Sequence, residues 1–161
     1  MSTSEPRRFD PGSRALVYRE LDHPADLWLE VRGVDLPNLV ENALFALYDS
    51  MVALERVEER REVTLHASGA SAAEALRTLL AEALFLFATE GFVGVAAQVH
   101  RLDSSTEPGS GDVRFQARVR GERLDTTRHE TRAEVKAVTY HLLDVTREAS
   151  GAFKAFVLLD V

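Results

Sequence analysis

The segment "LWLEVRGVDLPNLVENALFALYDSM" (residues 27–51) decides the fold class, because its hydrophobic period changes along its length. Residues 27–31 alternate with a period of two, which is typical of a strand with one buried face. From Leu36 to Met51, apolar residues recur three and four positions apart, which predicts an amphipathic helix. Asp35 stands where a residue capping that helix would lie. The change of period predicts a strand followed directly by a helix.

A second helix and several further strands follow along the chain. "SAAE" (71–74) is a capping box, the apolar spacing continues from it to Phe87, and Gly91 is a plausible stop. Period-two strands are predicted at 63–67, 93–99 and 113–119, and more continuously apolar ones at 135–145 and 153–161. This order predicts a single α+β domain, with two amphipathic helices packed on one face of a largely antiparallel sheet.

Length and composition narrow the classes of protein. The 161 residues fit one domain, which we place at 15–161 after a disordered tail at 1–14. The absence of cysteine excludes thiolate sites and is compatible with the cytoplasm. A net charge of −7 argues against a stand-alone nucleic-acid binder, and no apolar run is long enough to span a membrane. A cation or a basic partner suits such a chain better.

Two polar clusters could carry chemistry. Asp22, His23 and Asp26 precede the first strand, where they could bind a metal or simply form an Asp-rich turn. The segment "RHETRAEVKAVTYH" (128–141) crowds charged and imidazole groups before an apolar strand. Its Lys136 lies among apolar neighbours and needs a partner, so it is either functional or engaged in a salt bridge to Glu134 or Asp26.

The end of the chain is a third candidate. Asp160 and the carboxylate of Val161 follow an apolar run directly. With one more carboxylate they would form an oxygen-only site for Ca²⁺, Mg²⁺ or Mn²⁺. The alternative is a strand that ends in water.

Taken together, these clusters resemble the archease family. The resemblance is carried by "LDHPADLWLEVRGVDLPNLVENALFALYDSM" (21–51), by "RHETRAEVKAVTYHLLDV" (128–145) and by the final "LLDV" (158–161). It covers roughly residues 17–161. Pro24 stands where the family commonly has threonine.

The resemblance implies a function that the residues alone do not show. Archeases are protein cofactors of the RtcB-type RNA ligase in tRNA splicing and RNA repair, and they promote ligase guanylylation and multiple turnover. By carry-over, Asp26, Asp160 and Val161 would bind a divalent metal. The remaining polar residues would form a rim that meets the ligase, namely His23, His129, Glu130, Lys136 and His141. The chain would contact nucleic acid only through the ligase, and we do not expect it to catalyse a reaction itself.

Two other functions remain open at this stage. A small metal-dependent hydrolase or nucleotide-processing enzyme would use Asp26, His23 and Lys136. A chaperone-like modulator of a tRNA methyltransferase has also been suggested for the family. Turnover of nucleotides or phosphoesters, or prevention of partner aggregation, would distinguish these two.

Overall fold

The strands form two antiparallel sheets in the computed structural model, which describes residues 5–22, 25–104 and 112–161. Sheet A has the order β1-β5-β6-β4 and sheet B the order β2-β3-β9-β7, with β8 also paired to β9. Sheet A comprises β1 (Arg7–Arg8), β4 (Arg61–Gly69), β5 (Phe92–Ser104) and β6 (Val113–Arg123). Sheet B comprises β2 (Tyr18–Leu21), β3 (Asp26–Gly33), β7 (Ala137–Val138), β8 (Asp144–Arg147) and β9 (Phe153–Asp160).

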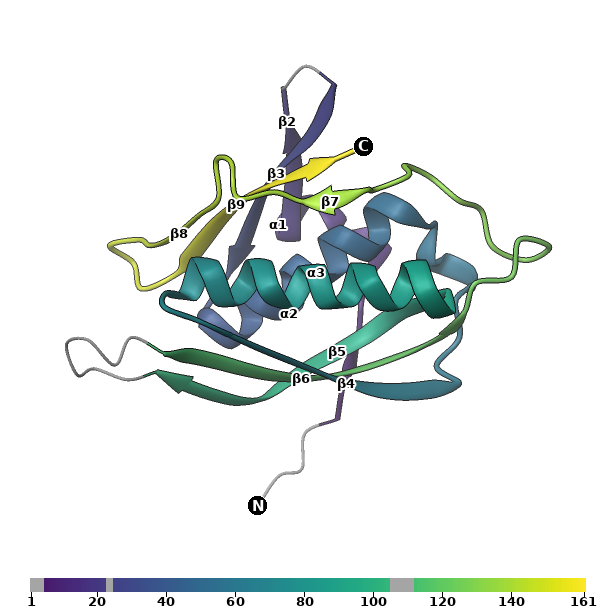
Figure 1. Cartoon of the computed structure of the whole chain (residues 1–161), viewed down its shortest axis with the longest axis horizontal. Coiled ribbons are helices and arrows are strands. Elements are labelled where there is room, and N and C mark those ends of the chain that lie inside the picture. The colour runs from purple at the N-terminus through teal and green to yellow at the C-terminus, as the bar shows by residue number, and fades with distance from the viewer. Residues whose placement is uncertain (1–4, 23–24, 105–111) are drawn as a thin grey trace.

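Two long helices, α2 (Leu36–Met51) and α3 (Ala72–Glu90), lie between the sheets (Figure 1). Short helical turns complete the fold, namely η1 (Pro11–Ser13), α1 (Arg14–Val17) and η2 (Leu54–Arg56). Every position of α2 from Ala43 to Asp49 is buried, because one side of the helix faces β5 and another faces β3. The helix α3 buries one face only. None of the helices in the described part of the chain is long and apolar enough to cross a bilayer.

The α+β class and both predicted helices are confirmed. The Asp35 carboxylate accepts a hydrogen bond from the Asn38 amide at 2.8 Å, and the Ser71 hydroxyl accepts one from the Glu74 amide at 3.2 Å. Gly91 ends α3 in the left-handed region, with φ of 70°. The strands nevertheless divide into two sheets where one was predicted, since α2 is buried on all sides from Ala43 to Asp49 and needs cover from both.

The prediction of one continuous strand over 135–145 is wrong. Only Ala137–Val138 and Asp144–Arg147 are strands, and the turn between them contains Leu142 with φ of 58°. Tyr140 and Leu142 are exposed, so the apolar residues of this run do not all enter the core. A continuous apolar run was read as a strand buried on both faces, whereas it follows the edge of β9 in two pieces.

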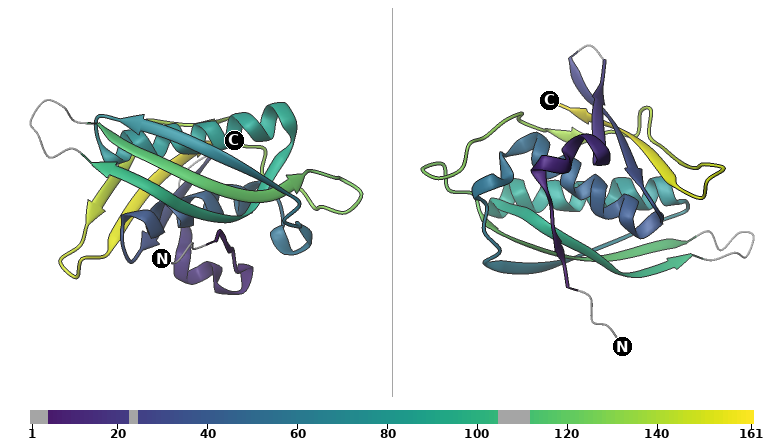
Figure 2. Two further views of the ribbon diagram at one scale, coloured as in Figure 1. Left: turned by 90° about the horizontal axis from the view of Figure 1, so that it is seen from below. Right: turned by 180° about the vertical axis from the view of Figure 1, so that it is seen from behind.

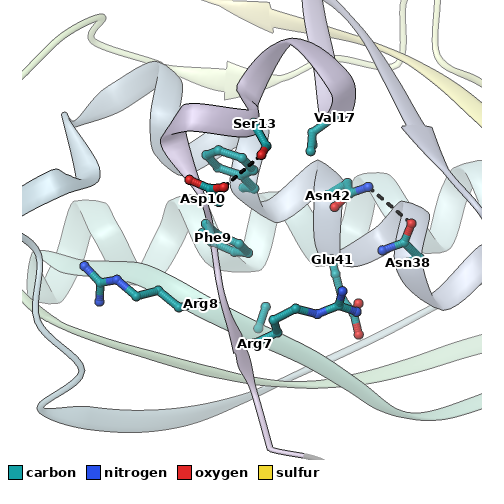
Figure 3. Close-up of a pocket in the computed structure, with 11 residues that line it drawn as sticks. Arg7, Arg8, Phe9, Asp10, Ser13, Val17, Asn38, Glu41 and Asn42 are labelled. Carbon is teal, nitrogen blue, oxygen red and sulfur yellow. Dashed lines mark hydrogen bonds between the residues drawn. The ribbon is translucent and has the colours of Figure 1, made fainter.

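The predicted disordered tail over 1–14 is wrong for residues 7–14. Arg7 and Arg8 pair with Ala97 and Ala96 of β5, and the buried ring of Phe9 stacks on Phe45 with ring centroids 4.9 Å apart. Figure 2 shows this segment crossing the rear of the molecule from sheet B to sheet A. We call residues 7–17 the N-terminal strap. It covers a small hollow of about 150 Å³ above α2 (Figure 3).

The Tyr48 side chain provides a first prediction, on stability. Its hydroxyl lies in the core with no hydrogen-bond partner among the described residues, and burial raises its pKa. Leaving a buried hydroxyl unpaired costs about 1–3 kcal/mol. We therefore expect Tyr48→Phe to raise the free energy of unfolding by about 1 kcal/mol, measured by urea denaturation. A clear loss of stability would show that the hydroxyl has a partner in solution, such as a buried water.

Candidate functional site

The strand register brings Asp26 and Asp160 together. They lie directly opposite one another where β3 pairs with β9, and opposed residues of an antiparallel pair have Cβ atoms about 4.5–5.5 Å apart. Leu29 on β3 and Val157 and Leu159 on β9 enter the core, so both aspartates belong to the outer face of sheet B. Asp160 is exposed and Asp26 half-buried. Residues 134 positions apart in sequence thus form one acidic pair.

The last residues of the chain are held in place beside this pair. The Val161 side chain packs against the hydrophobic core, and the Lys136 amide donates a hydrogen bond to the Asp160 carbonyl at 2.7 Å. Ala137 of β7 lies opposite Asp160 on its other side. The C-terminus lies at the end of β9 that pairs with the start of β3 (Figure 1). We call Asp26, Asp160, Val161 and Lys136 the C-terminal corner.

The donors at this corner suit a hard cation, because carboxylate oxygens are the ligands that Ca²⁺, Mg²⁺ and Mn²⁺ prefer. Within residues 5–22, 25–104 and 112–161, no three side chains of His, Asp or Glu lie close enough together to hold a metal ion. Asp26 and Asp160 therefore do not complete a site of three such side chains in this part of the chain. Like charges so close together would also repel one another without a cation.

Lys136 is the predicted rim residue that the structure places at this corner. Its side chain is exposed, and its backbone is bonded to Asp160. The ion pairs of the described residues do not include one between Lys136 and Glu134, one of the two structural alternatives considered for this lysine. His23 lies outside the described residues.

The other rim residues lie elsewhere, and His129 does not belong to a rim. The His129 ring is buried beyond the end of β6, where Nδ1 accepts the Asp125 amide at 2.9 Å and Nε2 lies 3.2 Å from the Glu122 carboxylate. Glu130 is exposed, and its carbonyl accepts the Ala53 amide after α2. His141 is exposed in the turn that follows β7.

The carboxylate beside His129 is structural. Burial acts to raise the pKa of Glu122, but hydrogen bonds from Arg128 and from the Glu58 amide outweigh it, so the pKa lies below its usual range. The Asp125 amide donates to Nδ1 of His129, and Nε2 lies within hydrogen-bond distance of the Glu122 carboxylate. This arrangement ties the 125–129 turn to β6, which explains why imidazole and charge gather in this segment.

Sequence reasoning missed the side chains next to the acidic pair. One step further along the outer face, Trp28 lies opposite Leu158, and Phe156 follows on β9. The Trp28 and Phe156 rings lie 6.0 Å apart. The alternation of β3 could have placed Trp28 on the same face as Asp26, because the two residues are two positions apart. The sequence of β9 is apolar at nearly every position, so it does not indicate which residues face outward.

Comparison with known proteins identifies the family. Residues 18–161 match the archease protein family (MTH1598/TM1083). The chain belongs to the archease family. The resemblance seen in the sequence is thus confirmed over nearly the same span.

Relatives in the archease family align over most of their length. The chain is 35% identical to the protein archease of Archaeoglobus fulgidus over 146 residues, which are 91% of this chain and 100% of that protein. It is 32% identical to an archease-like protein of Caenorhabditis briggsae, covering 89% of each. The solution structure of Methanobacterium thermoautotrophicum protein 1598 superposes with a TM-score of 0.76 at 29% identity, covering 89% of this chain and 98% of that one. The archease fold therefore extends from β2 to β9, and the whole N-terminal strap precedes the family match.

Proposed function

We propose that this chain is an accessory protein that activates an RtcB-type RNA ligase in tRNA splicing and RNA repair. It would promote guanylylation of the ligase and multiple turnover, act in the cytoplasm, and meet RNA only through its partner. Membership of the archease family supports this role. The single observation that carries the proposal is the C-terminal corner, where Asp26 and Asp160 face one another across β3 and β9.

At this corner, the carboxylates of Asp26, Asp160 and Val161 would hold a divalent cation, either Ca²⁺, Mg²⁺ or Mn²⁺. The cation would supply positive charge that removes the repulsion between the carboxylates. The anchored Val161 side chain and the Lys136 amide keep the last residues in reach of the aspartates. The exposed Lys136 ammonium group would then meet the ligase at the edge of the corner.

The test is guanylylation and RNA joining by the cognate ligase, with and without this protein. We expect the native chain to increase both rates and a chain extended by two glycines after Val161 to lose most of that effect, because extension removes the terminal carboxylate. Asp160→Asn should also lose most of the activation, because it removes one of the three carboxylates. Asp144→Asn is a matched control, since Asp144 is an exposed carboxylate elsewhere in sheet B and should leave activation unchanged.

Each contrary outcome has a distinct meaning. Activation by the extended chain would refute the terminal ligand and keep the accessory role. No activation by the native chain would refute the role itself. Metal-dependent release of phosphate by this protein alone would favour a hydrolase, and suppression of partner aggregation without faster joining would favour a chaperone-like function.

A further inference from the structure

The strand β4 forms an unprotected end of sheet A. Within the described residues it pairs with β6 alone, in an unbroken register from Arg61 to Gly69. The other end strands are short, since β1 and β7 have two residues each and β2 and β8 four. Natural proteins protect exposed strand edges by shortness, charged side chains, proline or bulges. Residues 63–69 contain no proline and no formally charged residue, so this edge lacks these protections.

The helix α3 runs along β4 and leaves an apolar face beside the open edge. A Cβ atom at Gly69 would lie 2.6 Å from the Ala75 amide nitrogen, and Arg61 pairs with Glu90 at 2.9 Å, so the two elements are antiparallel neighbours over their whole length. Phe85 of α3 is nevertheless 60% exposed. The positions three and four residues away on this helix are mostly small, namely Ala81, Glu82, Ala88 and Thr89.

The exposed side of α3 adjoins the outer face of sheet A at this edge. Thr78 of α3 lines a shallow hollow of about 400 Å³ together with His66 and Ser68 of β4. Figure 2 (left) shows α3 beside this end of the sheet. A strand added to β4 would therefore extend sheet A alongside an apolar helix face.

The sequence of β4 is complementary to itself. Pairing must keep inward residues opposite inward ones, because side chains alternate between the two faces of a sheet. If Thr64 lies opposite Thr64 of a second copy, Val63 lies opposite Leu65 and Glu62 opposite His66. These are a polar pair, an apolar pair and a carboxylate facing an imidazole, and pairs of these kinds stabilise antiparallel strands. No two like charges oppose one another in this register over residues 61–67.

We propose that two copies of this chain associate through antiparallel pairing of their β4 strands about Thr64, which joins the two copies of sheet A into one continuous sheet. A two-fold contact uses the same patch on both copies, so it requires the self-complementarity that β4 shows. Neither β4 nor α3 contributes a residue to the C-terminal corner. The association is therefore independent of the proposed metal site and of the ligase role.

The same symmetry brings the exposed faces of the two α3 helices together. Counted from the contact of Gly69 with Ala75, Thr64 lies somewhat beyond the middle of β4 and Phe85 somewhat beyond the middle of α3. The two residues are thus at a similar level along sheet A, and an axis through Thr64 passes near Phe85. The small residues around Phe85 allow the helices to approach to about 8–10 Å. This contact would bury the Phe85 ring.

Charge reversal at the axis tests the pairing. Light scattering after size exclusion should give the native chain a mass near twice 17.9 kDa. Thr64→Lys sets two ammonium groups opposite one another and should raise the dissociation constant by about tenfold or more, as should Thr64→Glu with its two carboxylates. A mixture of these two variants should recover the dimer, because lysine then faces glutamate. Phe85→Ala should weaken association by a similar factor without any change in β4.

Thr146 provides the matched control. It is an exposed threonine on β8, an end strand of sheet B, so Thr146→Lys and Thr146→Glu should leave the mass unchanged. Circular dichroism would check that each variant is folded.

Single cysteines test the register directly, because the native chain contains none. Opposed residues of an antiparallel pair have Cα atoms about 4.5–5.5 Å apart, a separation that a disulfide can span. Thr64→Cys should therefore form a covalent dimer under mild oxidation. Ser68→Cys on the same face should not, since the two copies of residue 68 would be about 27 Å apart, eight steps of about 3.4 Å.

Several outcomes would overturn the pairing. A native chain that keeps the mass of one copy at every concentration refutes it. A dimer that the Thr64 variants leave intact, or that their mixture does not restore, also refutes it, as does equal cross-linking through positions 64 and 68. If the native chain is monomeric and Thr64→Lys impairs capture of the ligase, the edge is a docking surface for another protein and self-association fails. If Thr64→Lys is unfolded, cross-linking of Thr64→Cys decides.

Discussion

Replacing Arg14 and Arg132 together with methionine should lower the free energy of unfolding by about 3–5 kcal/mol, because the buried Asp49 carboxylate would lose both of its cationic partners. The Asp49 carboxylate is completely buried in α2 and accepts hydrogen bonds from Arg14 at 2.5 and 2.9 Å and from Arg132 at 3.2 Å. Among the side chains of the described residues, the Tyr18 hydroxyl at 2.7 Å would be the remaining donor to this carboxylate. Hydrogen bonding to Asp49 raises the pKa of Arg14, so the Arg14 guanidinium stays charged in the native state.

Two further variants distinguish a stranded charge from lost packing. Adding Asp49→Asn to the double variant should restore part of the stability, because a neutral amide is less costly to bury than a carboxylate. Arg120→Met is the matched control, since Arg120 pairs with the exposed Glu62 and Glu5 and such pairs contribute about 0–1 kcal/mol. Urea denaturation would measure all of these variants. A double variant no less stable than the control would contradict the prediction.

Gly121→Ala should destabilise the protein by about 3 kcal/mol or more, through the backbone of sheet A. A Cβ atom at position 121 would lie 1.7 Å from the Val93 carbonyl oxygen and 2.9 Å from the Gly94 Cα atom. Neither neighbour is the flexible end of a side chain, so β5 and β6 would have to separate where Gly94 pairs with Gly121, next to a register shift of β5. Forcing extra volume into a packed interior costs about 1–3 kcal/mol and occasionally more.

Thermal unfolding monitored by circular dichroism would measure this loss. Gly12→Ala is the control, because the nearest atom to its added Cβ is the Asp10 carboxylate oxygen at 3.2 Å and the site is exposed. It should change the free energy of unfolding by no more than about 0.5 kcal/mol. If Gly121→Ala were equally mild, the close approach of β5 and β6 would be wrong.

Both helices could be predicted from the sequence because the residues that cap and end them lie close to the helix in sequence. Asp35, Ser71 and Gly91 each act within one turn of the helix they bound. The division into two sheets depends on pairings between distant segments, such as β3 with β9, which no local period encodes. The turn at Leu142 and the packing of Phe9 on Phe45 were not predicted for the same reason, since each depends on tertiary contacts.

The candidate site was predicted in part. The family resemblance, and not the residue pattern, united Asp26 with Asp160, and the register of β3 and β9 places them opposite one another. His129 was misplaced because its neighbours in sequence are charged, although its ring enters the interior to meet Glu122. The positions of polar groups near a strand can be read from sequence, but the side to which a loop turns them cannot.

The N-terminal strap has a consequence for how the protein behaves if it is cleaved. The whole strap precedes the family match, yet it pairs with β5 and supplies Arg14 to Asp49. A chain shortened to begin at Tyr18 would leave the backbone of β5 near Ala96 without its strand partner and uncover the Phe45 ring. Unprotected strand edges associate with one another. Proteolysis within the strap would thus expose an unpaired strand edge beside an uncovered aromatic ring, and we expect self-association to follow from the loss of seventeen residues.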